Sequence, residues 1–232
     1  MIHHPAVVKE MAVFKYLDDA RQGLIPEASK FGHESIDTYL RFKRGNFIVV
    51  TGHANVGKTH TMLYLMFLHT LNNGTKWLVY SSENDVRSIQ RKLIEFKAVK
   101  PIASLNPEAF KAHFDWVQKY FAFIDGENLY SIFELLEVMS EVADEWKFDG
   151  VLIDPYNSLV IDQKRLGKVS THDYHYEATS HLRVFCKKHD SIAILNTHPA
   201  TQALRKIHSG SHEYSGHPMP PMASDVEGGG KF

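Results

Sequence analysis

The sequence predicts an α/β fold in which a mainly parallel central sheet is flanked by helices. Short apolar strand patterns alternate along the chain with amphipathic helical patterns, which is the order that strand–helix–strand units produce. A glycine-rich loop, residues 52–59, joins the first strand pattern to the first long helical pattern. A chain of 232 residues that is 44% hydrophobic can bury the core that such a fold needs.

The first part of the chain predicts a helix that precedes the sheet domain. Residues 8–22 have an amphipathic pattern, and Gly23 and Pro26 then break it. We therefore divide the chain into a linker region, residues 1–24, and a sheet domain, residues 25–232. Such a helix either packs locally or docks on a neighbouring subunit, and the residues alone favour neither arrangement.

Within the sheet domain, strand patterns follow one another with helical patterns between them. Strands are expected at residues 47–50, 76–81, 120–124, 150–154 and 192–196. Helices are expected at residues 59–71, 84–99, 108–118, 129–146 and 172–189. Residues 203–230 are rich in Gly, Ser, His and Pro, and so long an irregular stretch is usually functional or mobile. Parallel strands place their carboxyl ends on one rim, where α/β proteins bind ligands.

Composition and charge exclude several classes of protein. The formal net charge is −1, so any nucleic-acid site must be a local basic patch. The single cysteine, Cys186, excludes an internal disulfide and fits a reducing compartment. No apolar run is long enough for a membrane span and no signal-peptide core is present, so we expect a cytoplasmic protein without a membrane partner. The fifteen histidines form no recognisable ligand set with Cys or carboxylates, which argues against a structural metal site.

The loop between the first strand and the first helix has the pattern G-x-x-x-x-G-K-T. Its residues are Gly52, His53, Ala54, Asn55, Val56, Gly57, Lys58 and Thr59. The glycines allow successive N–H groups to point at a phosphate, and the following helix adds the positive end of its dipole. We expect Lys58 to act in catalysis on the β- and γ-phosphates and the Thr59 hydroxyl to bind Mg²⁺. The strand before the loop and the helix after it argue against a chance glycine-rich turn.

Three further polar side chains are expected on the same rim. Asp154 ends the apolar run FDGVLID, the Walker B pattern, and is expected to hold Mg²⁺ through water. Glu83 follows the second strand and either accepts a proton from the attacking water or caps the next helix. His198 closes the fifth strand and either bonds the γ-phosphate or is a solvent-facing loop histidine.

Two groups of basic residues lie in loops that leave this rim. They are Lys164, Arg165 and Lys168 after the fourth strand, and Arg205 and Lys206 after the fifth. Runs of charge are usually just solvated. Their position would nevertheless let either loop couple the state of the phosphates to a bound polyanion.

Five segments of the chain resemble the RecA-like motor domain of DnaB-type ring helicases, particularly the phage and plasmid primase-helicase branch. They are GHANVGKT, SSEN, FDGVLIDPYNSL, ILNTHPA and DVEGGGKF. Their order and spacing agree with the family from about Ile25 to the C-terminus. Many NTPases share the loop motif alone, so the resemblance rests on the whole set.

The resemblance implies a RecA-like P-loop NTPase that uses ATP or another NTP with Mg²⁺ to move along single-stranded DNA, as a replicative helicase. It implies Glu83 as the catalytic base and His198 as the sensor of the γ-phosphate. The loops around Lys164 and from Leu204 to Gly230 would line a channel for single-stranded DNA. The helix at residues 8–22 would dock on the next subunit of a six-membered ring, with a primase as a further partner. The host would be a bacterium or a phage-infected cell.

The chain departs from the family's pattern in two ways. No primase or primase-binding domain precedes the motor, and the chain stops within the last motif, before the family's arginine finger. We therefore expect this chain to hydrolyse ATP poorly.

Two other functions stay open beside the helicase. One alternative is a recombinase or KaiC-like RecA ATPase with the same site and another output. The other is a nucleotide-dependent assembly scaffold, against which the intact Lys58, Thr59, Glu83 and Asp154 argue.

Overall fold

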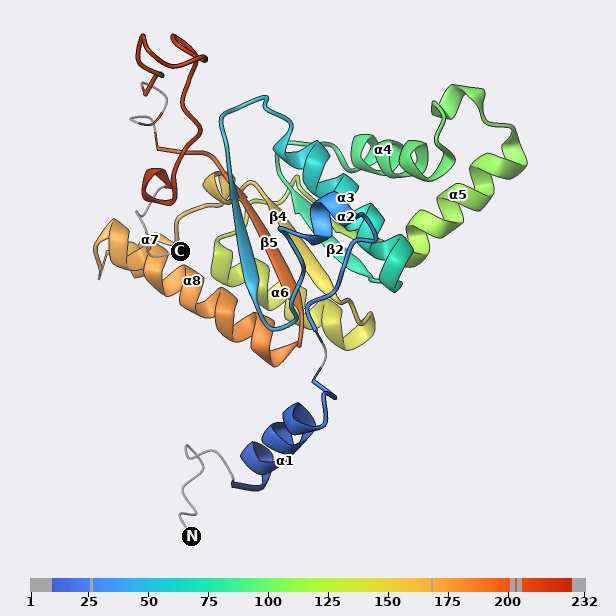
Figure 1. Ribbon diagram of the computed structural model, residues 1–232, viewed down its shortest axis with the longest axis horizontal. Helices are drawn as coiled ribbons and strands as arrows, with labels where there is room; N and C mark the ends of the chain where they lie inside the picture. The colour runs from blue at the N-terminus through green and yellow to red at the C-terminus, as the bar shows by residue number, and fades with distance from the viewer. Residues whose placement is uncertain (1–9, 26, 168, 201–202, 204–205, 227–232) are drawn as a thin grey trace.

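The computed structural model describes residues 10–25, 27–167, 169–200, 203 and 206–226, and it contains one five-stranded sheet. All neighbouring strands are parallel, in the order β1-β5-β4-β2-β3. The strands are β1 (Phe47–Thr51), β2 (Trp77–Ser81), β3 (Phe121–Ile124), β4 (Gly150–Asp154) and β5 (Ile192–Thr197). This arrangement confirms the predicted α/β fold (Figure 1).

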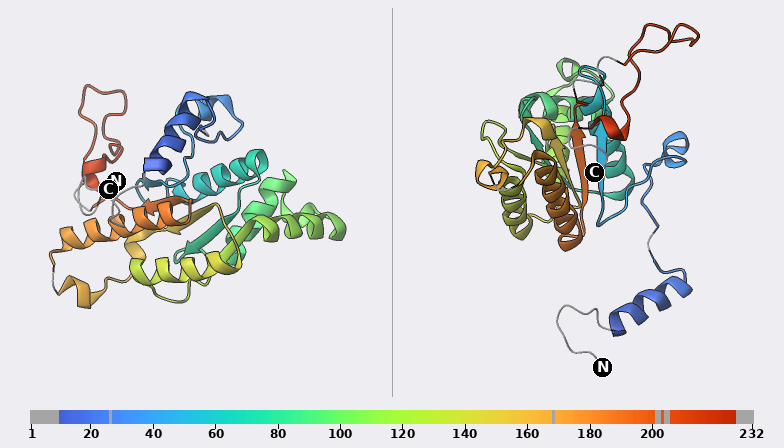
Figure 2. Two further views of the ribbon diagram at one scale, coloured as in Figure 1. Left: turned by 90° about the horizontal axis from the view of Figure 1, so that it is seen from below. Right: turned by 90° about the vertical axis from the view of Figure 1, so that its left-hand side faces the viewer.

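Helices cover both faces of the sheet, with α6 and α8 on one face and α3, α4 and α5 on the other (Figures 1 and 2). The α-helices are α1 (Glu10–Arg21), α2 (Glu34–Asp37), α3 (Lys58–Asn73), α4 (Val86–Ala98), α5 (Pro107–Tyr120), α6 (Ile132–Glu145), α7 (Gln163–Leu166) and α8 (Thr171–Lys188). The 3₁₀-helices are η1 (Ile102–Ser104), η2 (Tyr156–Ser158) and η4 (Ala223–Asp225). None of the helices in these residues has both the length and the apolar character that a bilayer span requires.

The core has two layers because successive strand residues point to opposite faces of the sheet. Tyr80 and its register partner Ile153 pack toward α6 and α8, whereas Val79 and its partner Leu152 pack toward α3 and α4. Both faces of the sheet are therefore buried, as expected of parallel strands.

Two helices begin later than the sequence pattern predicts because capping residues fix their first turns. Asp85 caps α4, and its carboxylate accepts a hydrogen bond from the Arg87 N–H at 2.9 Å. Ser131 and Glu134 form a capping box that begins α6. Leu129, which was expected on the helix, is 71% exposed in the preceding loop. The four-residue helices α2 and α7 were not predicted, since four residues are too few to show a helical period.

Helix α1 lies apart from the sheet domain (Figures 1 and 2). None of its residues is buried, and the apolar side chains of Met11, Phe14 and Leu17 are 77%, 65% and 59% exposed. The helix predicted over residues 8–22 is confirmed from Glu10 to Arg21, while residues 8 and 9 lie outside the described part of the chain. The helix therefore presents apolar side chains that its own domain does not cover.

A buried histidine, His69 of α3, joins the segment before β1 to the rest of the domain. Its ring nitrogens lie 2.7 Å from Ser29 Oγ and 2.7 Å from Thr75 Oγ1, and its ring packs against Phe31 and Phe42. Burial lowers the pKa of His69 from 6.5 to about 4, because a low-dielectric environment disfavours the charged imidazolium.

We expect His69 to make the protein less stable at pH 5 than at pH 7. Between these values an unfolded histidine binds a proton that folded His69 does not bind, so the free energy of unfolding falls as the pH falls. The loss at pH 5 is about 2 kcal/mol. Urea denaturation at the two pH values measures this loss of unfolding free energy. We expect the loss to disappear in His69→Gln and to remain in His172→Gln, whose histidine is exposed. A His69→Gln variant with the wild-type pH dependence would contradict the expectation.

Candidate nucleotide site

The glycine-rich loop, residues 52–59, lies at the carboxyl end of β1 and leads directly into α3. Gly57 is the N-cap of α3 and has a φ of 89°, and Asn55 has a φ of 61°. Glycine adopts such positive φ angles without strain, and asparagine tolerates them better than most residues. The first-turn N–H groups of this sixteen-residue helix add positive potential at the loop. The sequence-predicted phosphate loop thus has the backbone that an anion site requires.

The Lys58 ammonium lies over this loop. Lys58 Nζ donates hydrogen bonds to the carbonyl oxygens of Gly52 at 2.7 Å and His53 at 2.9 Å, and it lies 3.3 Å from His198 Nδ1. Burial lowers the pKa of Lys58, and the nearby carboxylates Asp154 and Glu83 act in the opposite sense. An anion bound in the loop would therefore meet this ammonium.

Asp154, at the end of β4, is 2% exposed and is surrounded by neutral hydrogen-bond donors. One carboxylate oxygen accepts from Thr59 Oγ1 at 2.8 Å and Asn84 Nδ2 at 3.4 Å, and the other accepts from Asn196 Nδ2 at 2.7 Å. The buried Asn196 Oδ1 has no hydrogen-bond partner among the described residues. The direct hydrogen-bond donors to Asp154 are neutral, and its carboxylate, the Thr59 hydroxyl and Asn196 Oδ1 all present oxygen atoms, so the residues fit Mg²⁺.

Glu83 and His198 face each other next to Lys58. His198 Nε2 lies 3.3 Å from Glu83 Oε1, so the His198 ring is situated between Glu83 and Lys58. The Glu83 side chain is 52% exposed and can reach solvent. The helix-capping alternative for Glu83 is wrong, because Asp85 caps α4. The contacts of both ring nitrogens also contradict the alternative of a solvent-facing histidine.

Three asparagines at this rim were not singled out from the sequence. Asn84 and Asn196 donate to Asp154, and Asn157 Oδ1 accepts a hydrogen bond from the His198 N–H at 2.6 Å. The amide of Asn196 within the apolar strand ILNT was a usable signal. The other two follow strands, where asparagine is common, so the sequence pattern does not distinguish them.

The basic residues that follow β4 have different surroundings. Arg165 forms ion pairs with Asp162, at 3.4 Å, and with Glu177, and its guanidinium carbon lies 4.0 Å from the centre of the Phe133 ring. For Lys164, in α7, the described residues contain no ion pair. Arg165 is thus held against its own domain, and Lys164 is the better placed of the two to contact a polyanion.

The segment after His198 lies over the phosphate loop, and in Figure 1 it extends from the rim in red. His53 Nε2 lies 2.9 Å from the Met219 carbonyl oxygen, and Lys206 forms an ion pair with Asp225. The Lys206 charge is therefore partly neutralised within the segment. Outside the described residues lie Lys168, Arg205 and the last glycine-rich motif from residue 227 onward.

Comparison with known proteins by sequence finds similarity to a curated protein. No known family model matches the chain. The chain is similar to the Twinkle homolog protein, chloroplastic/mitochondrial, of Arabidopsis thaliana, with 26% identity over 179 residues. The match covers 72% of this chain and 25% of the relative, so the chain spans about a quarter of that protein.

Solved structures with the same fold include an ATPase domain and a replicative helicase. The ATPase domain has a TM-score of 0.70 and 16% identity, and the match covers 98% of this chain and 80% of that one. The helicase is a DnaB-like replicative helicase, described with its interactions with primase, and has a TM-score of 0.64 and 15% identity over 97% of this chain and 54% of that one. These matches confirm the RecA-like fold and the resemblance to DnaB-type motor domains.

Proposed function

We propose that the chain is the motor of a replicative DNA helicase, which hydrolyses ATP or another NTP with Mg²⁺ and moves along single-stranded DNA. The observation that carries the proposal is the assembly of Lys58, Thr59, Glu83, Asp154 and His198 around one phosphate loop. Phosphoryl transfer needs a cation for the phosphates, ligands for a metal ion and a residue that orients water, and these side chains include all three. The likeness to helicase domains supports the choice of output.

The loop residues bind the nucleotide phosphates through their N–H groups, and Lys58 neutralises charge on the β- and γ-phosphates. Thr59 and Asp154 would hold Mg²⁺, which when bound stabilises negative charge on the phosphate oxygens. The 2.8 Å distance between Thr59 Oγ1 and Asp154 Oδ2 supports a shared role for the two residues.

Glu83 acts as the base that accepts a proton from the attacking water. His198 bonds the γ-phosphate, and its 3.3 Å contact with Glu83 links this sensor to the base. The exposure of Glu83 supports this role, since a water molecule must reach it. In this way the site stabilises charge and positions the nucleophile.

Residues 1–24 form a linker region and residues 25–232 the motor domain. The uncovered apolar side chains of α1 support docking of this helix on a second copy of the chain, in a six-membered ring. A primase is a further partner in this proposal. A bacterial or phage-infected cytoplasm stays a prediction, and the name of the Arabidopsis relative places that protein in the chloroplast and mitochondrion.

We expect Lys164→Ala to weaken binding of single-stranded DNA and to reduce its dependence on salt. Loss of one phosphate contact lowers the slope of log K against log salt concentration by about 0.7. Fluorescence anisotropy with a labelled oligonucleotide over a range of salt concentrations measures this slope. Lys100→Ala, on the exposed turn after α4, is the control and is expected to bind like wild type. An unchanged slope in Lys164→Ala would mean that this lysine is only solvated surface.

ATP hydrolysis measured with and without single-stranded DNA tests the proposed function. Stimulation by single strands supports a motor in which DNA binding is coupled to the phosphate site. Hydrolysis that is indifferent to DNA would instead favour a recombinase-like or KaiC-like ATPase with another partner. Nucleotide-dependent assembly without any hydrolysis would favour a scaffold.

A further inference from the structure

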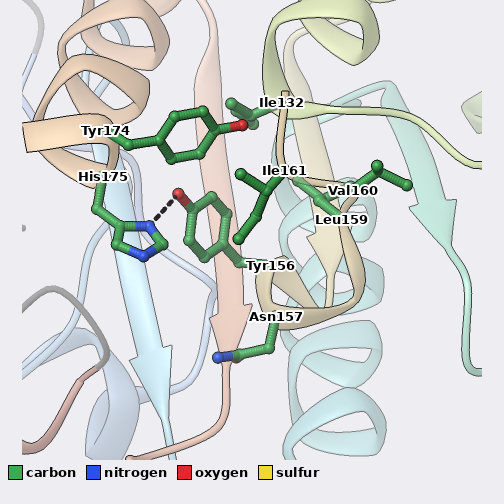
Figure 3. Close-up of a pocket in the computed structure, with 8 residues that line it drawn as sticks. All are labelled: Ile132, Tyr156, Asn157, Leu159, Val160, Ile161, Tyr174 and His175. Carbon is green, nitrogen blue, oxygen red and sulfur yellow. Dashed lines mark hydrogen bonds between the residues drawn. The ribbon is translucent and has the colours of Figure 1, made fainter. Parts of the chain in front are cut away.

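The chain that leaves β4 passes at once through η2, which lies between the end of β5 and the start of α8 (Figure 3). On one side of η2, Tyr156 Oη lies 2.7 Å from His175 Nδ1 of α8. Leu159, Val160 and Ile161 follow η2 and line a cavity of about 100 Å³. Tyr156 is itself buried in the core, so packing and this contact with His175 together hold one side of η2.

On the other side of η2, Asn157 points toward the end of β5 (Figure 3). Its Oδ1 accepts a hydrogen bond from the Thr197 hydroxyl at 2.6 Å and a second one from the His198 N–H at 2.6 Å. A backbone N–H can only donate, so the side-chain oxygen of Asn157, and not its amide nitrogen, must face His198. A leucine of nearly the same shape would lose both bonds.

Asn157 is itself exposed, whereas Thr197 is fully buried. The asparagine side chain therefore adds little to the core, and its bonds with the Thr197 hydroxyl and the His198 N–H act at the point where β5 ends. His198 follows at once, with its ring between Lys58 and Glu83. A backbone shift at His198 would move this ring relative to both of those groups.

We infer that Asn157 is a positioning residue, which fixes the backbone of His198 and thereby aims its imidazole into the phosphate site. The consequence for ligands rests on the proposed function, in which His198 contacts the γ-phosphate. Asn157 then contributes to the preference for a nucleoside triphosphate over a diphosphate without touching either nucleotide.

The first test measures nucleotide preference as the ratio of the dissociation constants for ADP and ATPγS, in wild type and in Asn157→Leu, His198→Ala and the double variant. Loss of one hydrogen bond to a charged phosphate lowers the ratio about tenfold or more in His198→Ala. Asn157→Leu is expected to lower it several-fold alone and to add nothing in the His198→Ala background. A purely structural effect would instead add to that of His198→Ala. Asn128→Leu, on the exposed loop after β3, is the matched control and is expected to keep the wild-type ratio.

The second test needs no nucleotide. Hydrogen–deuterium exchange followed by NMR is expected to show faster exchange of the His198 amide in Asn157→Leu, with the Leu195 amide within β5 unchanged. An unchanged His198 amide, or a retained nucleotide ratio in Asn157→Leu where His198→Ala loses it, would overturn the inference and leave the proposed function standing. If wild type shows no preference, or His198→Ala retains it, the proposed sensor role fails, and the exchange rates still decide whether Asn157 positions His198.

Discussion

Lys58→Met is expected to lower the affinity for ATP about 100-fold or more. Methionine keeps the length and apolar stem of lysine but removes the charge that two phosphates would share, and each hydrogen bond to a charged group contributes about 1.5–3 kcal/mol. Lys58 Nζ donates to the carbonyl oxygens of Gly52 and His53 in its own loop, so the ammonium already lies beside the loop that would hold the phosphates. Titration with a fluorescent ATP analogue measures the change.

Lys100→Met is the matched control for this change, because Lys100 is exposed and remote from the phosphate loop in the sequence. It is expected to bind ATP like wild type. Thermal unfolding of both variants shows whether a loss of affinity reflects a loss of folded protein. If a folded Lys58→Met variant bound ATP with wild-type affinity, the phosphate loop would not be part of the nucleotide site.

Glu83→Gln is expected to reduce ATP hydrolysis by a factor of about 10²–10⁴ while nucleotide binding stays near the wild-type value. Glutamine has the size of glutamate and can still contact His198, but it cannot accept the proton of the attacking water. Phosphate release with the protein in excess over ATP measures the chemical step even where turnover is slow. The separation of binding from hydrolysis is the result that identifies a base.

Glu127→Gln controls for the loss of a negative charge near the same rim, since Glu127 is exposed in the loop that follows β3. Its hydrolysis is expected to match wild type. Equal hydrolysis in Glu83→Gln and wild type would exclude Glu83 as the base. Nucleotide-dependent assembly that persists unchanged in Glu83→Gln would favour the scaffold alternative.

The order of elements was predictable because it follows from local pattern. The apolar runs of β2 and β4 and the phosphate-loop motif are short-range signals that a single sequence contains. The order β1-β5-β4-β2-β3 was not predictable in the same way, because it depends on how each helix carries the chain across the sheet. The position of the site at the carboxyl ends of the strands was predictable, because parallel strands place these ends on one rim.

The candidate site was predictable in its residue types but not in its contacts. Motif positions named Asp154 and His198, whereas the support from Asn157 arises where η2 meets β5, across a separation of about forty residues. The ion pair of Arg165 with Glu177 is likewise a tertiary contact. The sequence shows that Arg165 is basic, but it does not show that a carboxylate of the same domain already pairs with it. Local sequence patterns do not contain such partners.

The isolation of α1 has a consequence for how its structure depends on protein concentration. A twelve-residue helix with no buried residue is only marginally stable in water, because few helices of that length form without tertiary contacts. If its apolar side chains are covered only in an assembly, folding of α1 and association become one equilibrium. Helical content would then rise with protein concentration, and dilution would melt α1 while the sheet domain stays folded.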